Sequence, residues 1–130
     1  MNKIIAQISV GELLDKISIL EIKKEKIKDP AKLKFINDEH SILKEELNKN
    51  IKSSEKLDKL FETLKNINGK LWVIEDDKRV CEKEKDFGEK FIKLSRDIHF
   101  LNDDRAQIKL EINEYTDSKI KEIKEYTNYR

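Results

Sequence analysis

Several residue types that mark particular classes of protein are scarce in this chain of 130 residues. It has one cysteine, one proline and three glycines, and aromatic residues make up 7%. A single cysteine excludes an internal disulfide and indicates a reducing compartment, so we expect a cytoplasmic protein. One cysteine and two histidines far apart do not supply a zinc site, and the sequence has no glycine-rich phosphate loop. We therefore expect no metal and no cofactor.

An excess of charge of one sign and a long hydrophobic run are also missing. The 28 basic and 27 acidic side chains give a formal net charge of +1. No segment is a basic block, so the electrostatic footprint of a nucleic-acid-binding protein is absent. The first residues, MNKIIAQISV, contain too short an apolar run for a signal peptide, and no stretch approaches a membrane span. We expect neither a nucleic-acid partner nor a membrane location.

The sequence is rich in charged residues, at 42%, and its apolar residues recur at alternating spacings of three and four. This pattern is typical of amphipathic helices. Ser9 and Glu12 have the spacing of a capping box, and Asp29 precedes Pro30 as a helix start should. We predict helices over about 10–28, 30–48, 54–85 and 89–116, and a short C-terminal helix or a continuation in the tail. Residues 1–130 should form one all-α domain, an elongated antiparallel bundle of helical hairpins with coiled-coil-like packing.

The predicted helices differ in length, which has a consequence for partners. The last two would be about 45 Å long and the first two about 30 Å, so the hairpin around residues 74–98 should extend beyond its cover. Uncovered apolar surface usually marks contacts, and we expect a homodimer, with a separate protein partner as a second option. Phe35 and Ile42 also lie off the main apolar stripe of their helix. The interface candidates are Trp72, Ile74, Phe87, Phe91, Ile19 and Ile22.

Four charged or titratable residues occupy positions of the apolar stripes: Lys24, His40, Lys78 and Arg105. The structural interpretation, which we favour, pairs His40 with Glu21 and makes Arg105 either part of a register-setting ion pair or a dimer contact. In the functional interpretation these residues bind a small anionic ligand, and a glutamate serves as acid or base. The candidates for such a site are Arg105, Arg79, Arg96, Glu75, Glu21, Lys24 and His40.

The stretch KLWVIEDDKRVCE, residues 70–82, combines the only tryptophan and the only cysteine with three consecutive carboxylates. Adjacent residues on a helix point about 100° apart, so Glu75, Asp76 and Asp77 cannot converge on one metal ion. An ion pair between Glu75 and Arg79, four residues apart, is the simpler explanation. The side chains of Trp72, Glu75 and Arg79 should meet the neighbouring helix, a second subunit or a ligand.

Three long stretches resemble a family of short bacterial and phage proteins of unknown function: ISVGELLDKISILEIKKEKIKDPAKL, LWVIEDDKRVCEKEKDFGEKFIKLSRDI and NDDRAQIKLEIN. The resemblance implies a helical fold and no assigned reaction or ligand. A shorter stretch, DDRAQIKLEI, is similar to one helix of the helical chorismate mutases, which would imply a dianionic substrate held by Arg and Lys without a cofactor.

Two main hypotheses on function follow, and a third, a nucleic-acid-binding protein, would need the lysines to lie on one face of a helix. The first is a small helical interaction or structural protein that acts through a partner or dimer surface. The alternative is a binding module or cofactor-independent enzyme for a small anionic ligand. Because no catalytic constellation is recognisable, we lean against an enzyme.

Overall fold

The four predicted helices form, and each ends within two residues of its predicted limits. The computed structural model describes residues 1–129 and contains α1 (Val10–Lys26), α2 (Pro30–Asn50), α3 (Glu55–Glu84) and α4 (Glu89–Tyr115). Residues 1–129 include no strand, so the predicted all-α class is confirmed. No helix in this range combines the length and apolarity that a membrane crossing needs.

Side-chain caps fix the starts of the first three helices. The Oγ of Ser9 accepts a hydrogen bond from the N–H of Glu12, and Asp29 caps α2 ahead of Pro30, as predicted. Ser54 caps α3 in the same way. Each cap satisfies an N–H group that has no partner within its helix.

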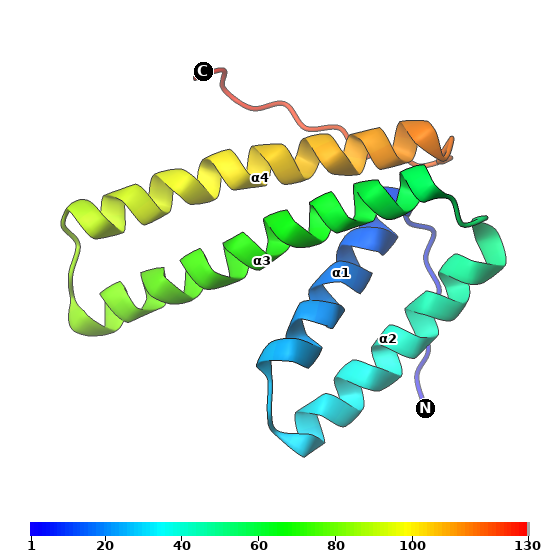
Figure 1. Cartoon of the computed structure of the whole chain (residues 1–130), viewed down its shortest axis with the longest axis horizontal. Helices are drawn as coiled ribbons and strands as arrows, with labels where there is room; N and C mark the ends of the chain where they lie inside the picture. The colour runs from blue at the N-terminus through cyan, green and yellow to red at the C-terminus, as the bar shows by residue number, and fades with distance from the viewer. Residues whose placement is uncertain (130) are drawn as a thin grey trace.

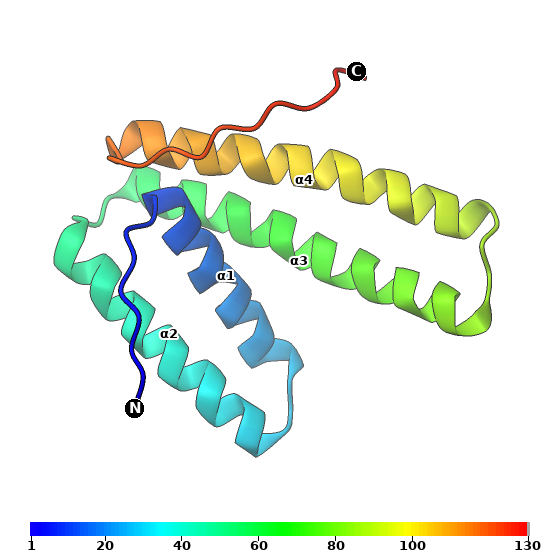
Figure 2. The ribbon, with the colours of Figure 1, turned by 180° about the vertical axis from the view of Figure 1, so that it is seen from behind.

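The helices form two antiparallel hairpins that are joined at one end (Figure 1). The helices α3 and α4 lie side by side along their length, whereas α2 packs on α1, and α1 contacts all three other helices. The α1–α2 hairpin diverges from α3, so the far half of the α3–α4 hairpin extends beyond it, as the helix lengths predicted (Figures 1 and 2). The main apolar core lies near the joined end and is formed by Leu14, Ile17, Leu47, Leu57, Leu64 and Ile112.

The predicted C-terminal helix is wrong, because residues 118–129 contain no helix. The helix α4 ends where Asp117 adopts a left-handed conformation, with φ of 51°, and the N–H of Ser118 donates to the carbonyl of Asn113. The segment 118–129, here called the tail, then folds back along α4 (Figure 2). Its apolar side chains, Ile123 and Tyr126 among them, are exposed. Helical spacing alone does not stabilise a short helix that has no core to cover.

Candidate functional site

A ladder of polar contacts joins the start of α1 to the second half of α4. Its α4 members are spaced four residues apart and therefore lie on one face of the helix. The distances are 2.7 Å from the N–H of Gly11 to Asn113 Oδ1, 2.7 Å from Lys109 Nζ to Glu12 Oε2, and 2.5 Å from Arg105 Nη2 to Asp15 Oδ2. We call these three pairs, Gly11–Asn113, Glu12–Lys109 and Asp15–Arg105, the α1–α4 ladder.

Gly11 allows the two helices to approach this closely. A Cβ atom at this position would lie 2.6 Å from the backbone oxygen of Lys109 and 3.0 Å from Asn113 Oδ1. The N–H of Val10 donates to Ser118 Oγ at 3.1 Å. The free N–H groups of the first turn of α1 are thus partly satisfied by residues about a hundred positions later in the chain.

Asp15 is the most deeply buried charge of the ladder, with 2% of its side chain exposed. Arg105 donates to both of its oxygens, at 2.9 and 2.5 Å, and Asn68 of α3 donates to one of them at 2.9 Å. These hydrogen bonds with Asp15 outweigh desolvation and raise the pKa of Arg105. Together with Asn68, the Asp15–Arg105 pair ties α1, α3 and α4 together, as the structural interpretation expects of an ion pair at this position.

A second polar cluster holds His40 where the structural interpretation placed it. His40 Nε2 lies 3.2 Å from Glu21 Oε2, and Lys65 of α3 lies 3.4 Å from Glu21 and 3.2 Å from Glu25. Burial lowers the pKa of Lys65, but the hydrogen bonds and charges of Glu25 and Glu21 outweigh it and raise that pKa. The cluster links α1, α2 and α3 and does not include the α1–α4 ladder.

The other ligand-binding candidates do not converge on one place. Arg79 and Arg96 are exposed on the projecting half of the α3–α4 hairpin, and Lys24 is half-buried near the end of α1. Glu75 is exposed, and its charge contributes to the raised pKa of Arg105. Within residues 1–129, Glu75 and Arg79 form no ion pair, so that prediction is wrong. Exposed pairs of the same spacing do form elsewhere, as between Lys59 and Glu55, but each contributes only a few tenths of a kcal/mol, so the loss of one costs little.

The predicted interface residues are mostly covered within the chain itself. Ile22 is buried, and Ile19, Trp72, Ile74 and Phe91 are half-buried. Phe87 is exposed and meets Phe91 edge to face, with ring centroids 5.4 Å apart. Their contact with a second copy stays a prediction.

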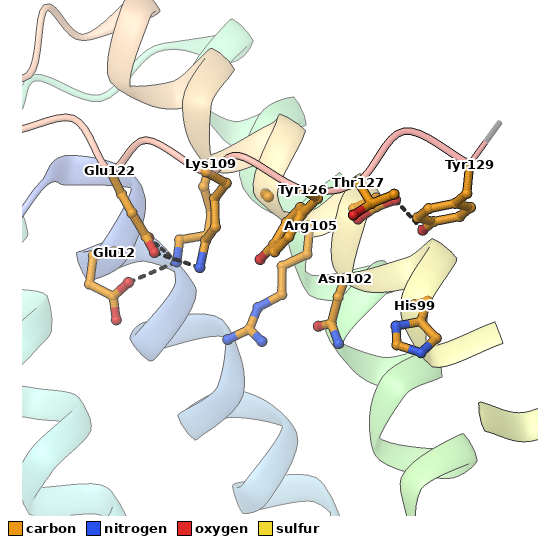
Figure 3. A pocket seen from close by; sticks show the side chains of 12 residues that line it. Glu12, His99, Asn102, Arg105, Lys109, Glu122, Tyr126, Thr127 and Tyr129 are labelled. Atoms are coloured by element: carbon orange, nitrogen blue, oxygen red, sulfur yellow. Dashed lines mark hydrogen bonds and ion pairs between the residues drawn. The ribbon is translucent and has the colours of Figure 1, made fainter. Parts of the chain in front are cut away.

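A cleft of about 610 Å³ lies between α4 and the tail (Figure 3). The helix lines it with His99, Asn102, Arg105 and Lys109, and the tail with Glu122, Lys124, Tyr126 and Tyr129. Lys109 Nζ lies between two carboxylates, 2.7 Å from Glu12 and 3.2 Å from Glu122. At the far end, the hydroxyl of Tyr129 donates to Asp103, and its ring lies 5.6 Å from that of Phe100.

The ladder and the cleft contain residues that the sequence analysis did not select, chiefly Asp15, Lys109 and Glu122. For Asp15, one pattern in the sequence of α1 could have revealed its role. Gly11, Asp15, Ser18 and Ile22 form a second stripe at spacings of four, three and four, beside the apolar stripe. All four are buried, because α1 is covered on more than one side. A stripe of small and polar residues on a helix predicts close contact with a neighbour.

The charges of the ladder balance one another. Asp15 neutralises Arg105 and Glu12 faces Lys109, so neither cation is left without a counter-charge. In residues 1–129 no group of histidine, cysteine and carboxylate side chains could hold a metal ion. The thiol of Cys81 is buried. The arrangement holds helices together and presents no nucleophile with a neighbouring base.

Comparisons with known proteins agree with the resemblance read from the sequence. The model of a family of unknown function matches residues 4–129, which is nearly the whole chain. No curated protein and no solved structure matches.

Proposed function

The chain belongs to the family DUF6165, and from its geometry we propose that it is a small helical interaction protein that acts as a two-fold homodimer. One observation carries the proposal. The outer face of α2 exposes Phe35 by 76% and Ile42 by 62%, and these residues lie two turns apart on one face. Because α2 packs on α1, nothing in residues 1–129 covers this face.

The pattern of charge on α2 suits a second copy of the same helix. Residues 28–34 contain three lysines and one aspartate, whereas residues 38–46 contain four carboxylates and one lysine. If two copies pair antiparallel about a two-fold axis between residues 38 and 39, Phe35 meets Ile42 of the second copy. Lys32 then meets Glu45 of the second copy, twice per dimer. Such self-complementarity is what a closed two-fold interface requires.

Two further observations bear on this proposal. Arg105 is bound at two positions by Asp15, so a cofactor-independent enzyme that uses Arg105 to hold a small anionic ligand has less support than the interaction protein. Cys81 is buried and forms no disulfide in residues 1–129, which supports action in the cytoplasm.

Analytical ultracentrifugation of the full chain tests the dimer. Phe35→Asp and Ile42→Glu should each weaken the dimer by at least about tenfold, since each places a charge in the centre of an apolar contact. Ile92→Glu is the matched control, because Ile92 is 55% exposed on α4, away from α2, and this variant should dimerise as the wild type does. A monomeric wild type, or an equal loss with Ile92→Glu, would overturn the proposal.

A gain of affinity provides a second test. Asp38 and Glu39 lie next to the proposed axis, where they would face the same carboxylates of the second copy. The double variant Asp38→Asn, Glu39→Gln removes this repulsion and should tighten the dimer by about two- to fivefold. A weaker dimer would contradict the antiparallel arrangement.

A further inference from the structure

The cleft between α4 and the tail has the size and the lining of a small-molecule site. Its volume of about 610 Å³ lies within the range of ligand pockets. One wall is a helix, and the other is an irregular segment with exposed side chains, which Figure 3 shows on either side of the cleft. The residues that line the two walls indicate the chemical class of ligand that would fit.

Part of the helical wall consists of polar side chains without a hydrogen bond in the described range, residues 1–129. His99, Asn102 and Arg105 follow one another at intervals of three on α4 and face the cleft. Among residues 1–129, the side chains of His99 and Asn102 form no hydrogen bond. They continue the face of the α1–α4 ladder past Arg105, where α1 has diverged from α4 (Figure 1). A ligand could therefore accept a hydrogen bond from the side chain of Asn102 or His99 without replacing an existing hydrogen bond of either residue.

Lys109 supplies the positive charge that would attract an anionic ligand to the cleft. Its side chain is 12% exposed and its ammonium group lies 2.7 Å from Glu12 and 3.2 Å from Glu122. Glu12 is fixed on α1, whereas Glu122 is on the tail and is more than one-third exposed. A poorly solvated ammonium that loses one carboxylate regains stability when another anion takes the same place. The exchange of Glu122 for a ligand carboxylate keeps the charge beside Lys109 unchanged, and a ligand phosphate makes it more negative.

We propose that this cleft binds a small ring-bearing molecule with a carboxylate or phosphate group, which displaces Glu122 from Lys109. The ring of such a ligand lies between His99 and Asn102 of α4 and the tyrosines of the tail, Tyr126 and Tyr129. The tail is the lid of the site, and Glu122 is a tethered carboxylate that occupies the anion position until a ligand arrives.

The contacts of the tail are consistent with a movable lid. Glu122 attaches it to Lys109, and Tyr129 attaches it to Asp103 and the ring of Phe100. Between these points Ile123 and Tyr126 are exposed, so lifting the segment uncovers little apolar surface. Segments with few buried apolar contacts open at low free-energy cost.

Isothermal titration of the full chain with phenyl phosphate and with benzoate tests the site, and benzyl alcohol is the neutral control. We expect at least one anion to bind while benzyl alcohol does not, and the two anions separate phosphate from carboxylate recognition. Glu122→Gln should tighten binding about two- to fivefold, because a partly exposed ion pair no longer competes. Glu125→Gln, an exposed change on the same tail, should leave the affinity unchanged.

A second variant tests the ligand position. Asn102→Asp keeps the size of the side chain and adds a negative charge to the cleft, so it should abolish anion binding. NMR shifts on binding should appear at His99 and Asn102 and not at the separate cluster around His40. The proposal is overturned if neither anion binds at about 10 mM, if benzyl alcohol binds equally, or if Glu122→Gln and Glu125→Gln behave alike.

Discussion

Gly11 and Gly69 both lie within helices, but alanine at the two positions should change the free energy of unfolding in opposite directions. In residues 1–129, no atom outside the helix backbone and the adjacent residues lies within 4 Å of a Cβ built at Gly69. Alanine is favoured over glycine in a helix interior by about 1 kcal/mol, so Gly69→Ala should stabilise the protein by about 0.5–1 kcal/mol. Nothing is lost in exchange, because the added methyl group meets open space.

At Gly11 the same methyl group would lie 2.6 Å from the backbone oxygen of Lys109. That oxygen belongs to α4 and cannot turn away as a side chain could, so α1 must shift outward. Overpacking of this kind costs about 1–3 kcal/mol. The shift also weakens the hydrogen bond from Gly11 N–H to Asn113 Oδ1, which contributes about 1 kcal/mol. Because Gly11 lies in the first turn, its gain in helix propensity is small, and we expect a net loss of about 1–3 kcal/mol.

Urea unfolding followed by circular dichroism measures both variants, and calorimetry provides a second reading. For a chain of 130 residues, 1 kcal/mol corresponds to about 3–5 °C in melting temperature. If Gly11→Ala unfolds at the wild-type urea concentration, the first turn of α1 does not press on α4. If Gly69→Ala is less stable than wild type, the space beside Gly69 is not free.

Two further predictions concern charge. Arg105→Met should lower the free energy of unfolding, measured in urea, by about 3 kcal/mol, because it leaves the buried carboxylate of Asp15 without its main partner. Adding Asp15→Asn should recover part of the loss. If it recovers nothing, the pairing is contradicted. Hydrogen bonds from Lys124, then Lys109, outweigh desolvation and lower the pKa of Glu122 below its ordinary 4.5. The contact with Lys109, which holds the tail to α4, should therefore be fully present above pH 4.5 and be lost as the pH falls through the lowered pKa. NMR signals of Lys109 should show a transition over that acidic range in the wild type, and this transition should be missing in Glu122→Gln.

The helices could be predicted from the sequence because their signals are local. Apolar spacing, the caps Ser9 and Asp29, and Pro30 act within a few residues of where they occur. The angle between the two hairpins has no local signal, because it depends on which face of α1 meets α4. In the tail a local signal was present but the helix was not: Ile120, Ile123 and Tyr126 have helical spacing, yet no surface within residues 1–129 buries that face.

The residues of the candidate site also divide into those that the sequence alone could identify and those that it could not. Arg105 could be selected from the sequence because it interrupts an apolar stripe, and His40 for the same reason. Lys109 and Glu122 occupy positions typical of a solvent-exposed surface, and they are about a dozen residues apart with a helix end between them. Only the reversal of the chain at Asp117 brings them together. Tertiary contacts between unremarkable charged residues are invisible to pattern analysis.

Lys109 contributes both to the stability of the fold and to the proposed ligand site. This determines which variants can separate an effect on folding from an effect on binding. Lys109 holds α1 through Glu12 and the tail through Glu122, and its backbone oxygen is the surface against which Gly11 packs. Any variant of Lys109 therefore changes folding and binding together. Glu122 pairs with Lys109 of α4 and with Lys124 of the tail but with no residue of α1 in the described range, and Asn102 forms no hydrogen bond in residues 1–129. Changes at these two positions alter the cleft while the α1–α4 ladder stays intact, so a difference in binding at constant melting temperature assigns function to the cleft itself.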